Sequence, residues 1–467
     1  MPIFVGAYLL VTLGIGVVAG RRVKTSQDFC LAGRKLSVWV CCASMFSTWF
    51  GAETIVGSPA EFLHHGILGI IEDPFGTTLC FFLLGRFFAR KIYDLNLLTV
   101  SDFIRQRYGA GVERWFSTMM VMCYFGWIGA QFIAMSVVIE TTVGVESHYS
   151  LWISATLVCA YTLLGGLWSV SYNDVIQTVV ILVSLVVICG YAVMQTASLQ
   201  PVLPTVTESG TSLFLFYPRG GGWLDWAKYV SAWIAIGFGD LCGQDVFQRV
   251  ASAKSRKVAA KAAYSAAVMY LAVGLIPVVL TYLFRLIYPD LSQVPAQQVL
   301  IYGIQAHTGK FIQVLFFGAL LSAIMSSASG GLIAVAVTVA ENMVRPYAPG
   351  MSDRHFLRLI RFCVVVSGLF SAWYASRNPR IYHLLLEASA FSTATQFVTF
   401  WLGLYTVVPK AINAFCAMGA GLMAWGLCMW FDYSEVSALF GLMISFIAFW
   451  LPSLPSLGSV VAKLKQV

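Results

Sequence analysis

Four serines crowd into eight residues in the second half of the chain. On a helix, Ser322, Ser326 and Ser329 follow i, i+4, i+7 spacing and share one face. Ala323 and Ser327 lie on the adjoining strip. A small hard cation binds hydroxyl and carbonyl oxygens in preference to sulfur or nitrogen, so the cluster predicts a ring of oxygen ligands for such a cation. The alternative is that small, hydroxylated residues let two transmembrane helices approach closely.

A second group of chemically active residues consists of carboxylates that fall within or at the edges of apolar segments. They are Glu53, Glu72, Asp73, Asp174, Asp240, Asp245 and Glu387. Ionised side chains are costly inside a bilayer and commonly mark the path of an ion or a substrate. Lysine and arginine gather instead at cytoplasmic ends, so acidic side chains outnumber basic ones within the apolar segments. This excess of acid favours a cationic cargo, either a metal ion or an organic amine. For any single acid, protonation or pairing with a nearby arginine such as Arg249 is the alternative.

The composition places these residues in a membrane. The chain has 467 residues, of which 59% are hydrophobic and 11% charged, as is typical of a polytopic helical membrane protein. Most basic residues fall in loops predicted to be cytoplasmic, so the net charge of +8 orients the chain in the bilayer and needs no nucleic-acid partner. Arg21, Arg22 and Lys24 follow the first apolar segment, which predicts an outer N-terminus, a cytoplasmic C-terminus and no cleaved signal.

Apolar segments bounded by charge, glycine or proline predict an all-α fold with about thirteen transmembrane helices. The predicted spans are 3–20, 36–62, 66–86, 115–142, 151–170, 174–197, 226–248, 262–288, 311–341, 360–376, 382–407, 411–430 and 435–452. A short interfacial helix is predicted between Thr99 and Gly109, because a Thr/Ser/Asp start and a glycine stop flank it. The whole chain is therefore expected to form a single membrane domain.

Two of these spans are interrupted near their centres by glycine and polar residues. Residues 44–60 contain Gly51, Gly57 and Pro59 around Glu53, and residues 235–248 contain three glycines around Asp240 and Asp245. Each interrupted span begins a block of five, and five is odd, so the second block is expected to lie inverted relative to the first. Paired discontinuous helices in inverted repeats are typical of secondary transporters with a site at the bilayer midplane.

The resulting division has five parts. Residues 1–35 form an N-terminal extra helix and cytoplasmic loop, 36–197 the first repeat, 198–225 an outer loop, 226–407 the second repeat, and 408–467 two C-terminal extra helices with a short tail.

The segment Tyr161–Gln177, which turns one span into the next through Gly165-Gly166, closely resembles a hallmark of the sodium:solute symporter family. The resemblance continues in the segments Asp28–Arg34, Thr99–Asp102, Arg107–Gly109, Phe247–Val250 and Ala253–Lys254. It implies a LeuT-type fold of five plus five inverted helices and sodium-driven import of a small organic solute by alternating access.

Carried over by position, the resemblance assigns a main sodium site to three backbone carbonyls and two hydroxyls. The carbonyls are those of Ser47, Phe50 and Ala323, and the hydroxyls are those of Ser326 and Ser327. Some relatives hold a second sodium with the aspartate that matches Asp174 and with serines that match Ser326 and Ser329. One further hydroxyl of those relatives is Gly330 here.

Within the family the chain looks most like the high-affinity choline transporter branch, whose pattern Trp49 and Trp127 match. Tryptophan faces attract quaternary ammonium groups by cation–π interaction; packing or lipid-facing bulk is the alternative for each ring. A third tryptophan expected just before Gln244 is Gly243 here, which leaves room for a bulkier or different amine. The candidate substrate-binding residues are Trp49, Glu53, Asp73, Trp127, Asp240 and Gln244.

Other functions remain as alternatives. A symporter for another solute class, such as proline or a monocarboxylate, would use the same fold, and the buried acids could instead line a cation channel. An enzyme is not expected, because no zinc-protease, nucleophile-elbow or phosphate-loop spacing occurs and Gly237, Gly239 and Gly243 miss the dinucleotide pattern by one residue. The expected partners are sodium, a small solute and the lipids of the plasma membrane.

Overall fold

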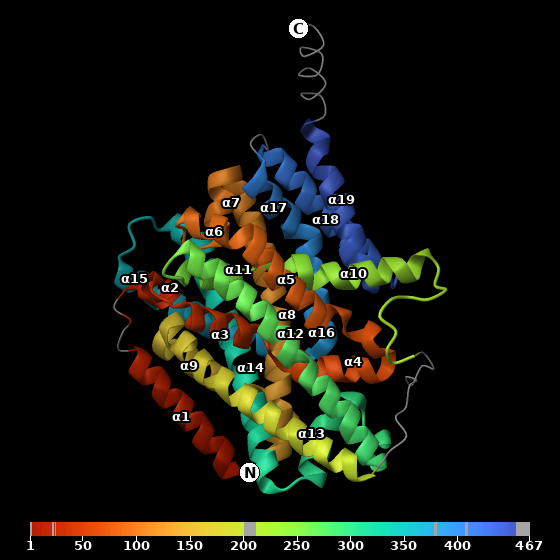
Figure 1. Cartoon of the computed structure of the whole chain (residues 1–467). Helices are drawn as coiled ribbons and strands as arrows, with labels where there is room; N and C mark the ends of the chain where they lie inside the picture. The colour runs from red at the N-terminus through yellow and green to blue at the C-terminus, as the bar shows by residue number, and fades with distance from the viewer. Residues whose placement is uncertain are drawn as a thin grey trace.

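A computed structural model of the chain describes residues 2–20, 23, 25–199, 212–377, 381–406 and 410–453. In this part of the chain, a parallel bridge joins Leu36 to Ala253, and the named elements are all helical (Figure 1). Eight of its helical stretches are long and apolar enough to cross a membrane, and α3 (Val38–Trp49) is a shorter apolar helix. The predicted all-α membrane architecture is confirmed, whereas the count of thirteen spans stays a prediction. Much of the predicted outer loop and the C-terminal tail lie outside the described residues.

The first predicted break is present at the end of α3. Ser37 caps the start of α3 through its hydroxyl, and the helix ends at Phe50, whose ψ of 79° is not helical. The chain resumes as a π-helical turn, η2 (Glu53–Gly57), and then as α4 (Ser58–His65). A Cβ on Gly51 would lie 2.8 Å from the hydroxyl of Ser327 on α14 (Lys310–Thr338), so glycine lets α14 approach the break closely.

The second predicted break is also present. The helix α10 (Trp223–Gly239) passes into a 3₁₀ turn, η6 (Asp240–Cys242), and the helix restarts as α11 (Gln244–Ser252) after an extended Gly243. Each break frees backbone carbonyl and amide groups that would otherwise be bonded within the helix. Such groups are suited to binding ions or solutes inside a membrane.

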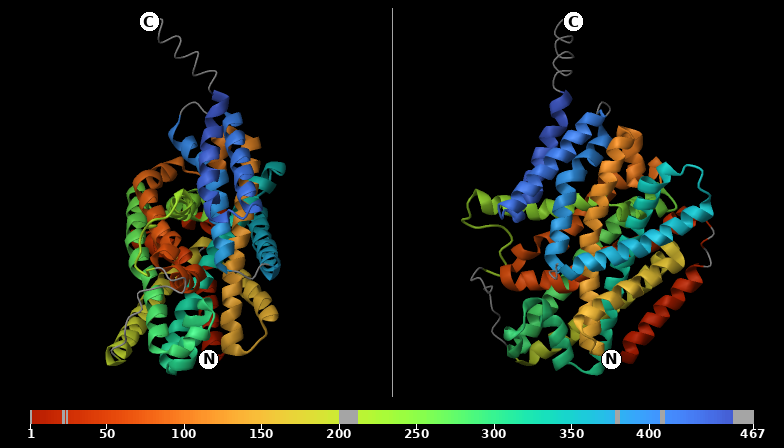
Figure 2. Two further views of the ribbon diagram at one scale, coloured as in Figure 1. Left: turned by 90° about the vertical axis from the view of Figure 1, so that its right-hand side faces the viewer. Right: turned by 180° about the vertical axis from the view of Figure 1, so that it is seen from behind.

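The predicted glycine turn bends the longest helix, α9 (Ser147–Leu199). Gly166 has a φ of 53°, and a Cβ there would lie 2.5 Å from the ring of Phe29 on the short helix α2 (Ser26–Leu31). Only glycine tolerates this conformation and this contact together. After the bend, α9 lies beside α14 and is covered by α1 (Pro2–Gly20), as Figures 1 and 2 show.

The remaining helices complete the bundle. They are α5 (Thr77–Leu83), α6 (Ala89–Leu95), α7 (Val100–Tyr108), α8 (Ala110–Val143), α12 (Arg256–Ile287), α13 (Val299–His307), α15 (Asp353–Arg377), α16 (Ile381–Ser392), α17 (Val398–Tyr405), α18 (Ala411–Trp430) and α19 (Ser437–Trp450). The predicted interfacial helix is α7, which Thr99 caps and Gly109 ends. In Figure 2, α18 and α19 lie side by side at the end of the molecule that carries the C-terminus.

The structure places helix at two points beyond the predicted spans. The helical stretch over the predicted span 66–86 continues to Leu95, where α17 holds Lys91: its ammonium lies 3.3 Å from the centre of the Tyr405 ring and donates to the Leu404 carbonyl. A charge at a membrane boundary therefore did not end the helix. Between the predicted spans 262–288 and 311–341 lies the short helix α13.

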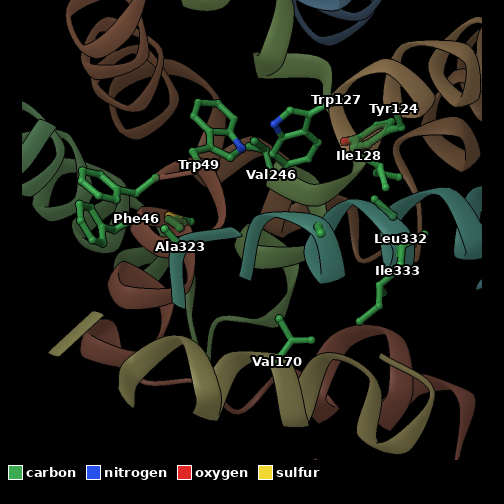
Figure 3. Packing of buried hydrophobic residues seen from close by; sticks show 14 of the residues in the cluster. Phe46, Trp49, Tyr124, Trp127, Ile128, Val170, Val246, Ala323, Leu332 and Ile333 are labelled. Carbon is green, nitrogen blue, oxygen red and sulfur yellow. The ribbon is translucent and has the colours of Figure 1, made fainter. Parts of the chain in front are cut away.

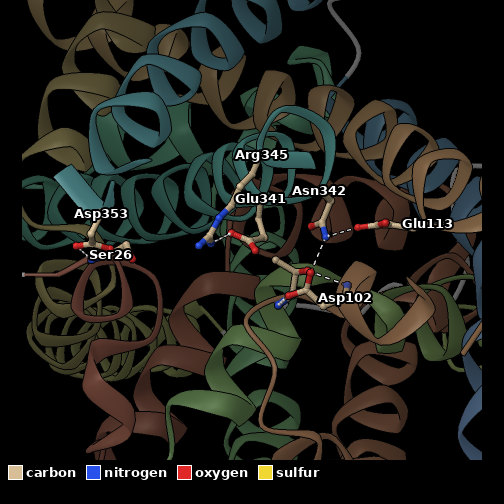
Figure 4. A network of polar contacts seen from close by, with 8 residues as sticks. Ser26, Asp102, Glu113, Glu341, Asn342, Arg345 and Asp353 are labelled. Carbon is tan, nitrogen blue, oxygen red and sulfur yellow. Dashed lines mark hydrogen bonds and ion pairs between the residues drawn. The ribbon is translucent and has the colours of Figure 1, made fainter. Parts of the chain in front are cut away.

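A polar network joins α7, α8 and η9 (Val339–Val344), the π-helical turn that follows α14 (Figure 4). The amide of Asn342 donates to Asp102 Oδ1 at 2.8 Å and to Glu113 Oε1 at 2.9 Å. Arg105 Nε lies 3.6 Å from the other oxygen of Glu113. Burial raises the pKa of Asp102, and the bond from Asn342 opposes that shift by stabilising the charged form.

We expect the substitution Asn342→Leu to lower thermal stability, because two largely buried carboxylates lose a donor. Loss of a donor to a buried acceptor costs about 1–3 kcal/mol. Fluorescence-detected size-exclusion after heating would measure the change, with Met343→Leu on the same turn as control. An unchanged melting temperature for Asn342→Leu would contradict this role.

Candidate functional site

A cavity of about 630 Å³, its open mouth included, lies at the two helix breaks, between α3, α8, α10 and α16. The carboxylates among its lining residues are Glu53, Asp73, Asp240 and Asp245. None of the described residues that line it is a lysine or an arginine. In their ionised form, acids around a cavity of low polarity produce a negative potential that attracts cations.

Two of these acids fix the orientation of the aromatic wall, whose rings Trp49, Tyr124 and Trp127 are labelled in Figure 3. Trp49 donates its indole N–H to Asp245 Oδ2 at 2.6 Å, and Trp127 donates its own to Glu53 Oε1 at 3.4 Å. The hydroxyl of Tyr124 also donates to Asp245, and its ring centre lies 5.7 Å from that of Trp127. The rings of Trp49, Tyr124 and Trp127 therefore line the cavity in fixed positions.

The structure gives a physical reason why Gly243 occupies the position where a third tryptophan was expected. A Cβ at Gly243 would lie 2.8 Å from Asp245 Oδ1 and 3.1 Å from the hydroxyl of Tyr124. A tryptophan would thus displace the Tyr124–Asp245 contact. One face of Trp49 stacks on Phe81 at a centroid distance of 4.5 Å, which leaves its other face for a ligand.

Asp73 is held by hydroxyl groups rather than by a base. Thr77 donates to its Oδ1 at 2.8 Å and Ser58 to its Oδ2 at 3.0 Å. The hydroxyl of Tyr270, on α12, lies 2.8 Å from Asp73 Oδ1 and 2.8 Å from the carbonyl oxygen of Trp49. Tyr270 therefore ties this acid to the broken end of α3.

Asp240 differs from the other three acids of the cavity. It is partly exposed, whereas the others are buried, and within the described chain it accepts one hydrogen bond, from Ser389 Oγ at 3.2 Å. Its charge is therefore the least compensated by protein donors and the most available to a ligand.

Gln244, which the sequence placed with the substrate residues, lies apart from the cavity lining. Its side chain is fully buried, accepts from the Val100 amide at 2.9 Å and donates to the Leu98 carbonyl at 3.2 Å. Both bonds reach the start of α7, so in this structure Gln244 links α11 to the interfacial helix.

The predicted ion-binding serines meet a carboxylate beside the cavity. Asp174 accepts hydrogen bonds from Ser44 Oγ at 2.5 Å and from Ser326 Oγ at 2.6 Å. Ser326 Oγ also lies 3.0 Å from Ser47 Oγ. All four side chains are fully buried. Hydrogen bonds between their oxygen atoms connect α3, α9 and α14 at this cluster.

The other predicted ion ligands lie at the same junction. Phe50 is at the broken end of α3, and Ala323 is buried one turn before Ser327. The Ser327 hydroxyl is buried and has no hydrogen-bond partner among the described residues. Such a group is normally satisfied by a ligand or an ordered water. Ser329 instead donates to the Ser326 carbonyl at 3.1 Å, so the structure does not bring its hydroxyl to Asp174.

Several site residues escaped the sequence analysis. They are Ser44, Tyr124, Gln131, Tyr270 and Ser389. Each is an uncharged polar residue in an apolar helix. The neighbouring sequence does not show whether such a side chain bonds its own helix or reaches another one. Gln131 shows the difficulty, since its Nε2 donates to Glu53 at 2.7 Å across a sequence separation of 78 residues.

Comparison with known proteins places the chain among membrane transporters. The profile of the sodium:solute symporter family matches residues 29–423. High-affinity choline transporter 1 of Caenorhabditis elegans is 25% identical over 414 residues, 81% of this chain and 68% of that protein. The human high affinity choline transporter 1 is 26% identical over 401 residues, with coverages of 81% and 67%. The chain thus spans about two-thirds of the length of these choline transporters.

The Escherichia coli (strain K12) sodium/pantothenate symporter is 24% identical over 429 residues, which cover 89% of this chain and 87% of the symporter. The matched proteins are transporters and not enzymes, as the sequence predicted.

Two solved transporter structures share the fold. A substrate-bound, outward-open Na+-coupled sialic acid symporter gives a TM-score of 0.78 at 17% identity, over 96% of this chain and 97% of that one. A nucleobase-cation-symport-1 family transporter in a closed conformation gives 0.61 at 12% identity, with coverages of 92% and 95%. These similarities confirm the expected LeuT-type fold.

We expect Tyr270→Phe to destabilise the site, because it removes a hydroxyl shared by Asp73, Thr54 and the Trp49 carbonyl. The cost of leaving these buried groups short of a partner is about 1–3 kcal/mol. Thermal unfolding of the purified protein would measure it, with the half-exposed Tyr302→Phe as control. Equal melting temperatures for the two variants would show that Tyr270 does not support the break.

Proposed function

The chain belongs to the sodium:solute symporter family, and from that premise we propose that it imports a small organic cation of the choline class together with sodium by alternating access. The observation that carries the choice of solute is the cavity with four acids, no lining base and a wall of oriented aromatic rings. A quaternary ammonium group against a desolvated tryptophan face gains about 2 kcal/mol.

Within that cavity we assign Asp240 as the counter-charge of the solute. Glu53 and Asp245 already accept from the indoles of Trp127 and Trp49, and Asp73 accepts from hydroxyls. Asp240, partly exposed and bonded by one serine, keeps the most charge free for a ligand. A cationic solute would therefore sit between Asp240 and the aromatic wall.

We assign the driving ion to the junction of α3 and α14. The proposed ligands are the backbone carbonyls of Ser47, Phe50 and Ala323 and the hydroxyls of Ser326 and Ser327. The orphan Ser327 hydroxyl and the charge of Asp174 nearby support a hard monovalent cation there. A second sodium at Asp174 and Ser329 has less support, because Ser329 donates within its own helix and Gly330 supplies no oxygen.

One sodium supplies enough energy for this function. A single charge that crosses about 100 mV inward releases about 2.3 kcal/mol. A tenfold sodium gradient adds about 1.4 kcal/mol, and the total supports roughly 500-fold accumulation of a neutral or zwitterionic solute. The potential also draws in a cation. We place the protein in the plasma membrane with an outer N-terminus, from the distribution of basic residues.

The pantothenate symporter among the relatives suggests a carboxylate solute as the alternative. A carboxylate would face the four acids of the cavity without a lysine or arginine among the described lining residues, so the charge argument favours the cation.

We expect proteoliposomes containing the protein to accumulate choline only under an inward sodium gradient. Radiolabelled choline, betaine, proline and pantothenate are compared, with potassium replacing sodium. The double variant Ser326→Ala/Ser327→Ala should lose at least about tenfold in sodium affinity, equivalent to about 1.4 kcal/mol. Ser445→Ala, which removes a buried hydroxyl from α19, is the control. Sodium-independent uptake, or unsaturable flux typical of a channel, would refute the proposal.

We expect Asp240→Asn to reduce choline uptake more than it reduces sodium binding. Loss of a desolvated counter-charge should raise the KM for choline by about tenfold or more, since hydrogen bonds to charged groups contribute about 1.5–3 kcal/mol. The exposed Asp432→Asn is the control, because asparagine tolerates the left-handed conformation found there. If Asp240→Asn kept the wild-type KM, Asp240 would not be the counter-charge.

A further inference from the structure

Arg249 is a buried cation to which neither the solute site nor the ion site has assigned a role. Its side chain on α11 is 1% exposed. Nε donates to the Ser44 carbonyl at 3.1 Å, Nη1 donates to the Asp245 carbonyl at 3.0 Å, and Nη2 donates to the Thr48 hydroxyl. In the described structure the guanidinium thus donates to two carbonyls and a hydroxyl, and it forms no direct ion pair with a carboxylate there.

The partners of Arg249 belong to the two sites. On one side, Asp245 orients the indole of Trp49 and the hydroxyl of Tyr124 in the cavity wall. On the other side, Ser44 donates its hydroxyl to Asp174 at 2.5 Å. The guanidinium therefore bonds the backbone of Asp245, whose side chain holds the cavity wall, and the backbone of Ser44, whose hydroxyl bonds the carboxylate of the ion cluster.

Asp174 continues this chain of contacts to the ion ligands. It accepts from Ser326 at 2.6 Å, and Ser326 lies 3.0 Å from Ser47. Thr48, which accepts from Arg249, is the residue next to Ser47. A cation that draws Ser326 and Ser47 towards itself must therefore alter the contacts of Asp174, Ser44 and Thr48.

Gly330 provides the space for the guanidinium. A Cβ at this position would lie 2.7 Å from Arg249 Nη2 and 2.9 Å from Thr48 Cγ2. Gly330 is on α14, one turn beyond Ser326 and Ser327, so the helix that carries the ion hydroxyls also holds Arg249 in place. Since Nη2 is the end of a flexible side chain, a methyl group here should displace the guanidinium without breaking the helix.

We propose that Arg249 is the positioning residue that couples sodium binding to the shape of the solute cavity. Sodium at Ser326 and Ser327 changes the bonds of Asp174 and Ser44; Arg249 transmits this change to Asp245, which sets the position of Trp49 and Tyr124. The inference rests on the proposed sodium-coupled function. Coupling of this kind is measured as the factor by which occupancy of one site alters the other, commonly about 5- to 150-fold.

The test uses the purified full-length protein in nanodiscs and needs no identified solute. Cys123 lines the cavity next to Tyr124, so its rate of alkylation by N-ethylmaleimide, followed by peptide mass spectrometry, reports on the cavity. Binding of 22Na+ by scintillation proximity is measured on the same samples. The variant is Gly330→Ala; the control is Gly318→Ala on the same helix, where the added methyl would lie 3.3 Å from the ring of Phe4.

We expect sodium, compared with potassium, to change the Cys123 rate by about fivefold or more in the wild type and in Gly318→Ala. Gly330→Ala should bind 22Na+ with wild-type affinity while the sodium effect on Cys123 falls below about twofold. If Gly330→Ala fails to give a monodisperse protein, Thr48→Val removes the acceptor of Nη2 and should weaken the effect in the same direction.

Three results would overturn the inference. A full sodium effect on Cys123 in Gly330→Ala would show that the cavity senses sodium by another path. Loss of 22Na+ binding in that variant would make Arg249 part of the ion site instead of a link from it. A wild type that binds no 22Na+ would overturn the proposed function itself, and this inference with it.

Discussion

The structure depends on one buried carboxylate, Asp174, that is held by hydroxyl groups from two other helices. Ser44 on α3 and Ser326 on α14 donate to it at 2.5 and 2.6 Å. A charge buried without a base is costly unless a cation or several donors compensate it. Three helices must therefore meet at this point in a fixed arrangement, and that arrangement places the orphan hydroxyl of Ser327 at the broken end of α3.

The same physical constraint recurs in the cavity. Each of its acids is held by neutral donors, such as the indole of Trp127 on Glu53 and the hydroxyls around Asp73. Neutral donors orient a carboxylate but do not cancel the charge of its ionised form, which a cation can therefore still bind. The glycines at both breaks, Gly51 and Gly243, allow the close approaches on which this geometry depends.

Much of this arrangement could be predicted from the sequence, because it follows from residue type and spacing. Both helix breaks, the bend at Gly166 and the cap of α7 by Thr99 were expected and are present. Contacts between helices could not be predicted in the same way. Gln244 illustrates this: its position near the break suggested a substrate residue, yet its amide bonds the start of α7. The pairing of Ser44 with Asp174 depends on helix packing that no local pattern encodes.

The most direct test of the account is 22Na+ binding to purified Ser327→Ala beside the wild type. The Ser327 hydroxyl has no partner in the described structure, so its removal should leave the melting temperature unchanged. If that oxygen binds the driving ion, sodium affinity should fall by about tenfold, or about 1.4 kcal/mol. Wild-type sodium affinity in Ser327→Ala would contradict the account.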